Sequence, residues 1–393
     1  MKIRFLGGTR EVGRSAVLAM SDNTKILLDY GVMFDHQPGF PMHVQPKAVD
    51  AVAMTHSHLD HSGAIPVFHI HRKIPVFGTK LSFDLVQLLI SDFIHLSGYY
   101  LPFEYIELQT MLRSCVPLDY REQKTVGNIQ IQLSDAGHLP GSAQVLVETE
   151  GKRLLYTSDY NLTETRLLHG ADKEYGELDA LIMESTYADE VHPDRKASEK
   201  EFVESLREVV ENGGTALVPA FGVGRSQEII CILAAHHFDY SVTIDGMTRK
   251  TNRILMEHTA FLRDPRLFMD AVHSVTWVDG WRDRRKAPKK PGVIVSPAGM
   301  LKGGPAAFYV QKLGKKSRNA IVLVSYQIPG TPGRELLEHG RCVIDGKMQK
   351  VKAKVERFDF SSHCGASELQ ETVKGLKGNP KVYVVHGAEG NCK

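Results

Sequence analysis

Apolar and polar positions alternate with two different periods along the chain, and these patterns predict short strands and longer helices. Alternation with a period of two marks 129–133, and 142–149 and 152–159 form a predicted hairpin around a glycine-containing turn. Apolar residues at helical spacing mark 82–98. Four more strands are predicted nearer the amino terminus, at 2–7, 15–20, 25–31 and 50–55. The chain up to residue 186 therefore alternates strands with helices.

Beyond residue 186 the pattern becomes that of a parallel α/β unit, with strands and helices following one another in turn. The predicted elements are a helix in 192–214, a strand at 215–221, a helix at 226–236, and strands at 240–245, 292–299 and 320–326. The chain is then basic and extended at 346–360, and it ends with a helix and a strand at 381–387. We therefore predict an α/β domain over 1–186 that is interrupted by a second domain, 187–345, and completed by 346–393.

Composition and charge add few constraints. A chain of 393 residues is long for one core, which agrees with two domains. The net charge of +2 does not point to a partner, because a nearly neutral protein can still carry a basic groove. No apolar run approaches the ~20 residues that span a bilayer, and the amino terminus carries charge and glycine instead of an apolar signal segment. Five scattered cysteines without a C-x-x-C pair suit reduced thiols. We expect a cytoplasmic protein that does not bind membranes.

A dense cluster of metal-binding side chains follows the predicted strand 50–55. Its members are His56, His58, Asp60 and His61. Side chains alternate in extended backbone, so the first three could point to one side of a loop, with His61 beside them. Imidazole and carboxylate groups suit Zn²⁺, Mn²⁺ or Fe. Four such groups exceed what one catalytic metal needs, so some of them could serve a second metal. A polar loop with solvated histidines is the alternative, and the density of the motif argues against it.

The segment "THSHLDH" resembles the signature of the metallo-β-lactamase superfamily, whose fold is an αββα sandwich with metals at one edge. The family pattern implies that His138 of "DAGHLPGSA" is a further ligand and that Asp159 of "LLYTSDYN" bridges two metals. It also implies that Asp29 of "KILLDYG" orients the histidine loop without touching the metal. Taken singly, each of these three residues could equally be a turn or capping residue. Their order and setting together favour the family.

Further segments resemble the β-CASP branch of this superfamily, which comprises nucleic-acid nucleases with an α/β cap domain inserted into the lactamase core. The segments are "IMESTYA", "VPAFGVGRSQEII", "SPAGMLKGGPA", "SYQIPGTPGREL", "RFDFSSHCGA" and "VVHG". In that branch Glu184, His363 and His386 match motifs A, B and C. The resemblance implies that His386 is a ligand and that His363, oriented by Glu184, protonates the leaving oxygen. The alternatives are a capping residue for His363 and an ordinary histidine at the end of a strand for His386.

The resemblance implies two metal ions, for which we expect two Zn²⁺ per chain, with Mn²⁺ as an alternative. One ion would be held by His56, His58 and His138, the other by Asp60, His61 and His386, with Asp159 shared. Asp60 is therefore expected to be needed for catalysis. Two such ions can clamp the attacking and leaving sides of a phosphodiester.

The residue at motif C bears on the substrate, because DNA-repair members of the branch carry valine there and RNA-processing members carry histidine. RNA is therefore the expected partner. The segments "SPAGMLKGG" and "SYQIPGTPGREL" resemble the cleavage-and-polyadenylation-specificity-factor group, and the length without a KH module resembles its shorter archaeal members. This implies a metal-dependent ribonuclease in RNA 3′-end processing or decay, first an endonuclease, with 5′-to-3′ exonuclease activity as a second mode. A homodimer and contacts with transcription or RNA-decay machinery are further expectations.

The sequence leaves open two alternative functions and the role of two basic segments. A hydrolase of small thioesters or lactams on the same fold is less favoured because of the cap insertion, and a non-catalytic scaffold because every ligand position is filled. The basic segments 281–290 and 347–354 could line a groove for a phosphate backbone or could be solvated surface.

Overall fold

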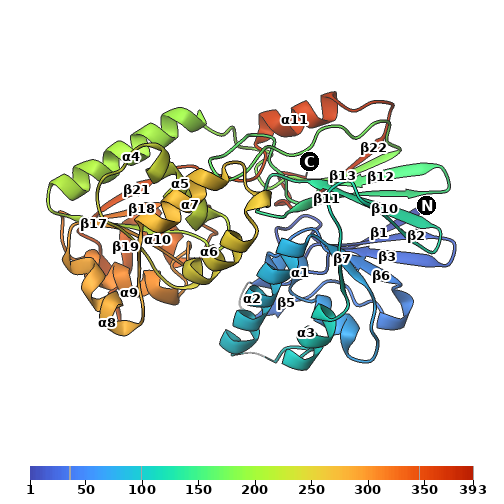
Figure 1. The fold of residues 1–393 in the computed structure, drawn as a ribbon, viewed down its shortest axis with the longest axis horizontal. Helices are drawn as coiled ribbons and strands as arrows, with labels where there is room; N and C mark the ends of the chain where they lie inside the picture. Colours follow the sequence, from blue (N-terminus) through green and yellow to red (C-terminus); the bar gives the residue numbers. More distant parts are fainter. Residues whose placement is uncertain (35–36, 99, 345, 393) are drawn as a thin grey trace. The chain divides into compact units, whose positions relative to one another are not determined.

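The computed structural model describes residues 1–34, 37–98, 100–344 and 346–392 (Figure 1). It consists of two compact units. The first unit contains residues 1–164, 169–191 and the chain from 362 onward, and the second contains 165–168 and 192–361. The expected domain limits at 186 and 345 stay a prediction. The chain from Ser362 onward belongs to the first unit again, and segment 346–361 lies in the second.

Two six-stranded sheets form the first unit. The first sheet has the order β1 (Lys2–Gly7), β2 (Ala16–Ser21), β3 (Thr24–Leu28), β6 (Ala51–Ala53), β7 (Val76–Gly78) and β8 (Cys115–Pro117). The second has the order β22 (Lys381–Val385), β13 (Ala180–Glu184), β12 (Lys152–Tyr156), β11 (Ala143–Thr149), β10 (Ile129–Asp135) and β9 (Gln123–Val126). A short hairpin joins β4 (Met33–Phe34) to β5 (Pro38–Gly39). Strands β10, β11 and β12 form an antiparallel meander, which confirms the predicted hairpin.

The two sheets face each other across one apolar core. Alternate residues of β3, β10 and β12, among them Leu28, Leu133 and Leu154, are fully buried in this core. The helices of this unit are α1 (Leu59–Ser62), α2 (Lys80–Leu96), α3 (Tyr105–Leu112) and α11 (Ala366–Lys374). Figure 1 shows α2 and α3 beside the first sheet and α11 beside the second. The predicted αββα sandwich is confirmed.

Each outer face of the sandwich carries its own apolar layer. Phe83, Val86 and Ile90, at helical spacing along α2, join the buried cluster on the outside of the first sheet. Leu369 of α11 joins a smaller cluster on the outside of the second sheet. The α2 helix begins at Thr79, whose side chain accepts a hydrogen bond from the Ser82 backbone amide at 3.2 Å.

Parallel pairing in each sheet brings distant segments to one edge. Strands β3 and β6 are parallel, so the residues that follow them, around 29 and 55, leave the first sheet at the same edge. Strands β12, β13 and β22 are also parallel, so the residues around 159, 184 and 386 leave the second sheet together. Candidate site residues from these five segments therefore meet at one end of the sandwich.

The second unit is built on a six-stranded parallel sheet, which confirms the predicted parallel α/β unit. The order is β16 (Thr276–Trp277), β15 (Val242–Ile244), β17 (Gly292–Ser296), β14 (Thr215–Pro219), β18 (Ala320–Leu323) and β21 (Lys354–Arg357). Its helices are α4 (Arg195–Glu211), α5 (Arg225–Ala235), α6 (Met247–Glu257), α7 (Pro265–Ser274), α8 (Trp281–Lys286), α9 (Gly304–Leu313) and α10 (Pro332–His339). Strands β19 (Arg341–Ile344) and β20 (Lys347–Lys350) form a separate hairpin.

Helices cover both faces of this sheet. Leu217, Ile294 and Leu323 point from three adjacent strands into a cluster with α9. The residues that alternate with them face the opposite side, where α4 and α5 lie against β14 and β17. The α/β cap domain predicted from the sequence is therefore present. Within the described part of the chain, no helix is both long enough and apolar enough to cross a lipid bilayer.

Candidate metal centre

The histidine motif lies where the chain leaves β6 and enters α1. His56 follows the strand and is fully buried, and His58 is the residue that precedes the first turn of α1. Asp60 and His61 lie inside that turn. Gly31 contacts the turn so closely that a side chain at position 31 would collide with the backbone oxygen of Asp60, at 1.7 Å from an ideal Cβ. The backbone around the motif is therefore tightly packed.

The structure brings the expected ligands together in two groups. In the first group the ligand atoms lie within 4.8 Å of one another and belong to His56, His58, His138 and Asp159. In the second they belong to Asp60, His61 and His386. His138 Nε2 lies 3.3 Å from His58 Nδ1, and His386 Nε2 lies 3.4 Å from Asp60 Oδ2. These are groups of nitrogen and oxygen donors of the kind that bind zinc or manganese.

Asp159 lies between the two groups. Its Oδ2 is 3.8 Å from both His56 Nε2 and His138 Nε2, and 3.3 Å from His61 Nε2. Its Oδ1 is 3.2 Å from His386 Nδ1. One carboxylate therefore faces members of both groups, as a ligand shared between two metal ions would.

Asp29 contacts His61 of the second group at Nδ1, the ring nitrogen that does not face Asp159. It leaves β3 in a left-handed conformation, with a φ of 56°, and it is fully buried. Its Oδ2 lies 2.8 Å from His61 Nδ1, and the same carboxylate accepts hydrogen bonds from the Thr55 amide at 2.8 Å and hydroxyl at 2.7 Å. The Tyr156 hydroxyl adds a donor at 3.1 Å. A carboxylate on Nδ1 fixes His61 as the tautomer whose Nε2 faces the centre.

His363 and Glu184 form a pair beside these groups. His363 Nδ1 lies 2.9 and 2.8 Å from the two oxygens of Glu184, which is 1% exposed. Glu184 also accepts hydrogen bonds from the Tyr160 amide at 2.9 Å and from the Thr186 hydroxyl. Burial alone would lower the pKa of His363, but Glu184 and Asp159 raise it to about 9. At pH 7 this imidazole therefore carries a proton.

The electrostatics of the centre fit a cation. Burial lowers the pKa of His56, His58 and His138, so these imidazoles are neutral at pH 7, the form that binds metals. Burial alone would raise the pKa of Asp159, but His386 and His61 hold it well below its usual value. His56 Nε2 and Asp159 Oδ1 are buried without a hydrogen-bond partner among the described residues. A buried carboxylate beside neutral imidazoles with unsatisfied atoms is the donor set of a metal site.

Sequence reasoning missed the residues that hold the ligands in place. Thr55 Oγ1 lies 3.1 Å from His56 Nδ1 and 2.7 Å from Ser158 Oγ, and the Ser362 carbonyl lies 2.9 Å from His138 Nδ1. Thr55 and Ser158 stand directly before two expected ligands, which is the one signal that the sequence carries for them. His69 and His71, which are also two positions apart in the sequence, lie outside both ligand groups.

Three family models match the chain. The first is a metallo-beta-lactamase superfamily domain over residues 18–186, the second a Beta-Casp domain over 226–336, and the third a Zn-dependent metallo-hydrolase RNA specificity domain over 348–393. The first covers the histidine motif together with His138, Asp159 and Glu184. The third covers His363 and His386.

Several relatives match over nearly the whole chain. RNase aCSPSF2 of Saccharolobus solfataricus is 43% identical over 99% of this chain and 80% of its own length. Probable RNase MJ4 of Methanocaldococcus jannaschii is 37% identical over 99% of this chain and 94% of its own length. A longer protein of the latter organism, transcription termination factor FttA, is 32% identical over all of this chain and 68% of its own length.

A solved structure shows the same fold. It is a protein of unknown function from Enterococcus faecalis, which superposes with a TM-score of 0.61 at 16% identity, over 98% of this chain and 94% of that protein. Fold and centre thus define a metallo-hydrolase of the lactamase type with an inserted cap. The chain belongs to the β-CASP branch of the metallo-β-lactamase superfamily, and the predicted resemblance to archaeal ribonucleases of this branch is confirmed.

Proposed function

We propose that the chain is a metal-dependent ribonuclease that hydrolyses RNA phosphodiester bonds at a two-metal site, in RNA 3′-end processing or decay. One observation carries the proposal: Asp159 faces both ligand groups, and the His363–Glu184 pair lies beside them. Ribonuclease names among the relatives favour RNA as the substrate.

Two divalent ions fit the chain's own residues. His56, His58 and His138 would hold one, Asp60, His61 and His386 the other, and Asp159 would be shared. We propose zinc for both, with manganese as the alternative, since these ligands suit either. When bound, such ions favour ionised water at neutral pH and offset negative charge on the phosphate oxygens.

The remaining roles belong to side chains. A water molecule loses a proton to solvent, and the resulting hydroxide oxygen attacks phosphorus as the bond to the leaving oxygen breaks. His363 donates its proton to that leaving oxygen and regains one from solvent, so that a 3′ hydroxyl and a 5′ phosphate result. Glu184 holds the imidazole through Nδ1, which leaves Nε2 to carry the donated proton. Against the effect of burial, Glu184 raises the pKa of His363 and so favours the protonated imidazole that a general acid needs.

Endonucleolytic cleavage is the first activity that we propose, with 5′-to-3′ exonuclease activity at the same centre as a second mode. Homodimer formation and contacts with transcription or RNA-decay machinery stay predictions. The name of one relative, a transcription termination factor, supports a search for the latter.

The test uses two 3′-labelled RNAs of one sequence, one with a 5′ monophosphate and one with a blocked 5′ end. Internal cuts on both RNAs by the metal-loaded protein, absent with Asp60→Ala, are the expected result. Stepwise loss of the monophosphate RNA alone would assign the exonuclease mode. If neither RNA is cut while two ions are bound, the ribonuclease proposal fails and hydrolysis of thioesters or lactams is tested next.

A further inference from the structure

A pocket of about 370 Å³ at the amino edge of the sheet in the second unit is lined by five cationic side chains. They are Lys289, Lys290, Lys312, Lys316 and Arg318. The residues come from the loops that precede β17 and β18 and from the end of α9. We call this site the basic pocket. It includes the end of the basic segment 281–290, for which the sequence left two interpretations open.

The charge in the basic pocket is not compensated. No carboxylate lines it, and none of the five cations forms an ion pair within the described ranges of the chain. Five positive charges at one site exceed the formal net charge of the whole chain, +2. Cations held this close repel one another, and an anionic ligand removes that cost.

Two buried polar residues, Asn319 and Thr215, form hydrogen bonds with the backbone segments that carry these cations. Asn319, 4% exposed, accepts a hydrogen bond from the Thr215 amide at 3.0 Å and donates one to the Leu313 carbonyl at 3.1 Å. Thr215, also 4% exposed, donates its hydroxyl to the Lys290 carbonyl at 2.9 Å. The starts of β14 and β18, the end of α9 and the loop before β17 are therefore tied together. The basic pocket is preformed, which lowers the entropic cost of binding.

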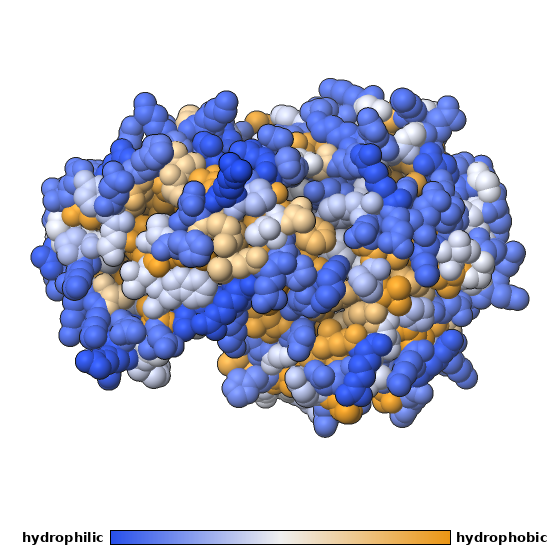
Figure 2. Space-filling model, viewed as in Figure 1, coloured by the Kyte–Doolittle hydropathy of each residue, from blue (hydrophilic) through white to orange (hydrophobic). Residues whose placement is uncertain are grey.

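An exposed aromatic surface adjoins the basic pocket. Lys312 Nζ lies 5.5 Å from the ring centre of Phe308, and the Phe308 ring meets the Trp281 ring edge to face at 5.7 Å. Trp281 is 61% exposed, which is unusual for a side chain of this size. We call Phe308 and Trp281 the aromatic platform. Figure 2 shows mostly hydrophilic colours, with smaller hydrophobic areas, over the part of the surface where Figure 1 labels α8 and α9.

The aromatic platform is in contact with an ion pair between Arg284 and the buried Asp245. The Arg284 guanidinium lies 4.9 Å from the ring centre of Trp281 and donates to both oxygens of Asp245, at 2.6 and 2.8 Å. Asp245 is fully buried and also accepts from the Tyr309 hydroxyl at 2.7 Å. This ion pair fixes the Arg284 guanidinium against the indole of Trp281 and so restrains the position of the exposed ring.

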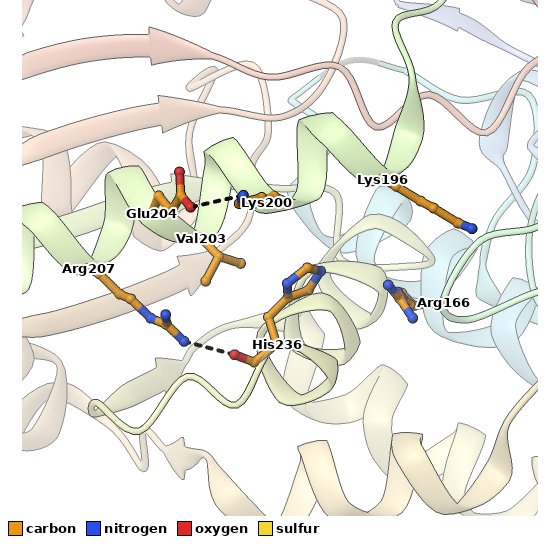
Figure 3. Close-up of a pocket in the computed structure, with 7 residues that line it drawn as sticks. All are labelled: Arg166, Lys196, Lys200, Val203, Glu204, Arg207 and His236. Atoms are coloured by element: carbon orange, nitrogen blue, oxygen red, sulfur yellow. Dashed lines mark hydrogen bonds and ion pairs between the residues drawn. The ribbon is translucent and has the colours of Figure 1, made fainter.

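Another pocket of this unit carries a smaller excess of positive charge. It lies between α4 and the end of α5, with a volume of about 430 Å³ (Figure 3). Its Lys200 pairs with Glu204 at 3.9 Å, and Glu199, 3% exposed, lies 2.7 Å from Arg166 Nη2 and 3.0 Å from His236 Nε2. Arg207 is engaged by the His236 carbonyl at 2.8 Å. Three of its four Lys and Arg side chains, all except Lys196, thus contact protein oxygens, whereas the cations of the basic pocket form no ion pair within the described ranges.

We propose that this face is a second binding site for single-stranded RNA, separate from the metal centre. Phosphates of the strand contact the basic pocket, and a neighbouring base stacks on Trp281. Charge complementarity selects a polyanion, and the aromatic platform selects one that carries bases. The inference rests on the proposed ribonuclease function, for which it supplies a site that holds the substrate strand away from the bond that is cut.

The test measures binding without cleavage. The full-length chain, stripped of metal by a chelator, is titrated against a fluorescently labelled single-stranded RNA of about 20 nucleotides, and anisotropy is recorded over a range of KCl concentrations. The variants are the triple substitution Lys312→Gln, Lys316→Gln, Arg318→Gln, and the single substitutions Trp281→Ala and Trp281→Phe. The control triple Lys2→Gln, Arg4→Gln, Lys124→Gln removes the same charge from exposed residues of the first unit. Circular dichroism verifies that each variant folds.

The expected results differ between the two parts of the site. Loss of three phosphate contacts lowers the slope of log affinity against log salt by about 2, at about 0.7 per contact on a single strand. Trp281→Ala lowers the affinity by about tenfold with the slope nearly unchanged, and Trp281→Phe retains most of the affinity because a stacking ring remains. The control triple keeps the slope of the wild type.

Equal losses in the basic-pocket triple and the control triple would overturn the proposal, as would no loss in either. Inorganic tripolyphosphate is the competitor: if it displaces the RNA while Trp281→Ala has no effect, the basic pocket binds free polyphosphate and the RNA proposal is wrong. Cleavage is assayed separately with metal restored. A wild-type chain that binds RNA here but cuts none would overturn the proposed function alone. A chain that cuts RNA while the basic-pocket triple binds like the wild type would overturn this inference alone.

Discussion

Glu184 and His363 are 179 positions apart in the chain, yet both carboxylate oxygens lie within 2.9 Å of one imidazole nitrogen. The contact depends on topology: Glu184 ends β13, and His363 lies just after the point where the chain rejoins the first unit. Glu184 thereby orients the imidazole and stabilises its charged form. His363 is not a member of any group of potential metal ligands among the described residues, so its proton stays available for donation.

His363→Ala should separate metal binding from catalysis. The side chain belongs to neither of the two ligand groups, nor to the further group of potential ligand atoms formed by Asp159, Glu184 and His386, so we expect metal content to stay at the wild-type level. Cleavage of RNA should fall by roughly 10²–10⁴-fold, because general acid catalysis is lost. Elemental analysis and single-turnover cleavage measure the two quantities. His71→Ala, an exposed histidine outside the centre, is the matched control. Full activity in His363→Ala would refute the acid role.

Glu184→Gln should shift the alkaline limit of activity. The acid must be protonated, so the rate falls as pH rises through the pKa of His363, which Glu184 and Asp159 raise to about 9 against the effect of burial. Removing the Glu184 charge lowers that pKa, and the limit should move down by about 1 pH unit or more. Bound cations repel the imidazolium in both proteins, so the difference between the two profiles is the quantity to measure. Coincident alkaline limbs would show that Glu184 does not control this proton.

Asp29→Asn should weaken metal binding without removing a ligand. The carboxylate holds His61 Nδ1 at 2.8 Å, and an amide nitrogen in its place would present a donor to a donor. We expect a metal affinity that is 10–100-fold lower for the group containing His61, measured by competition with a chromophoric chelator. Asp22→Asn, at an exposed position, is the control. Unchanged affinity in Asp29→Asn would mean that Asp29 stabilises the fold only.

The sequence predicts much of this molecule because local patterns carry it. Alternation at 129–133 identifies β10, and the strand–helix order beyond residue 186 identifies the parallel sheet of the second unit. The spacing of His56, His58, Asp60 and His61 identifies a metal motif because few other uses require such density. Resemblance then supplies the ligands that lie far away in the chain.

Pairing between distant strands is what the sequence does not reveal. Strand β22 lies beside β13, and β21 lies beside β18, but an alternating pattern does not specify which sheet a strand joins. The sequence also gives no sign of the polar residues around the expected ligands. Thr55 and Ser158 are ordinary hydroxyl residues in the sequence, and only the placement of β6 and β12 brings their Oγ1 and Oγ atoms to 2.7 Å from each other. Such contacts arise from the tertiary structure.

Asp135→Asn should stabilise the protein at neutral pH but not at acidic pH. Burial at the end of β10 raises the pKa of Asp135 to about 6, although the Gly137 amide donates to its Oδ1 at 2.8 Å. The folded state thus binds this proton more tightly than the unfolded state, so stability is greatest below about pH 4 and falls as pH rises towards 6. Above that pH the charged carboxylate costs up to about 3 kcal/mol.

Asparagine keeps an oxygen for the Gly137 amide and has no proton to lose. The free energy of unfolding should therefore rise by about 1–3 kcal/mol at pH 7.5 and stay nearly unchanged at pH 4. Thermal unfolding at the two pH values measures the difference, and Asp239→Asn, at an exposed position, controls for the loss of a surface charge. An equal gain at both pH values would show that ionisation of Asp135 does not limit stability. A loss at pH 7.5 would show that the carboxylate makes a contact that the amide cannot replace.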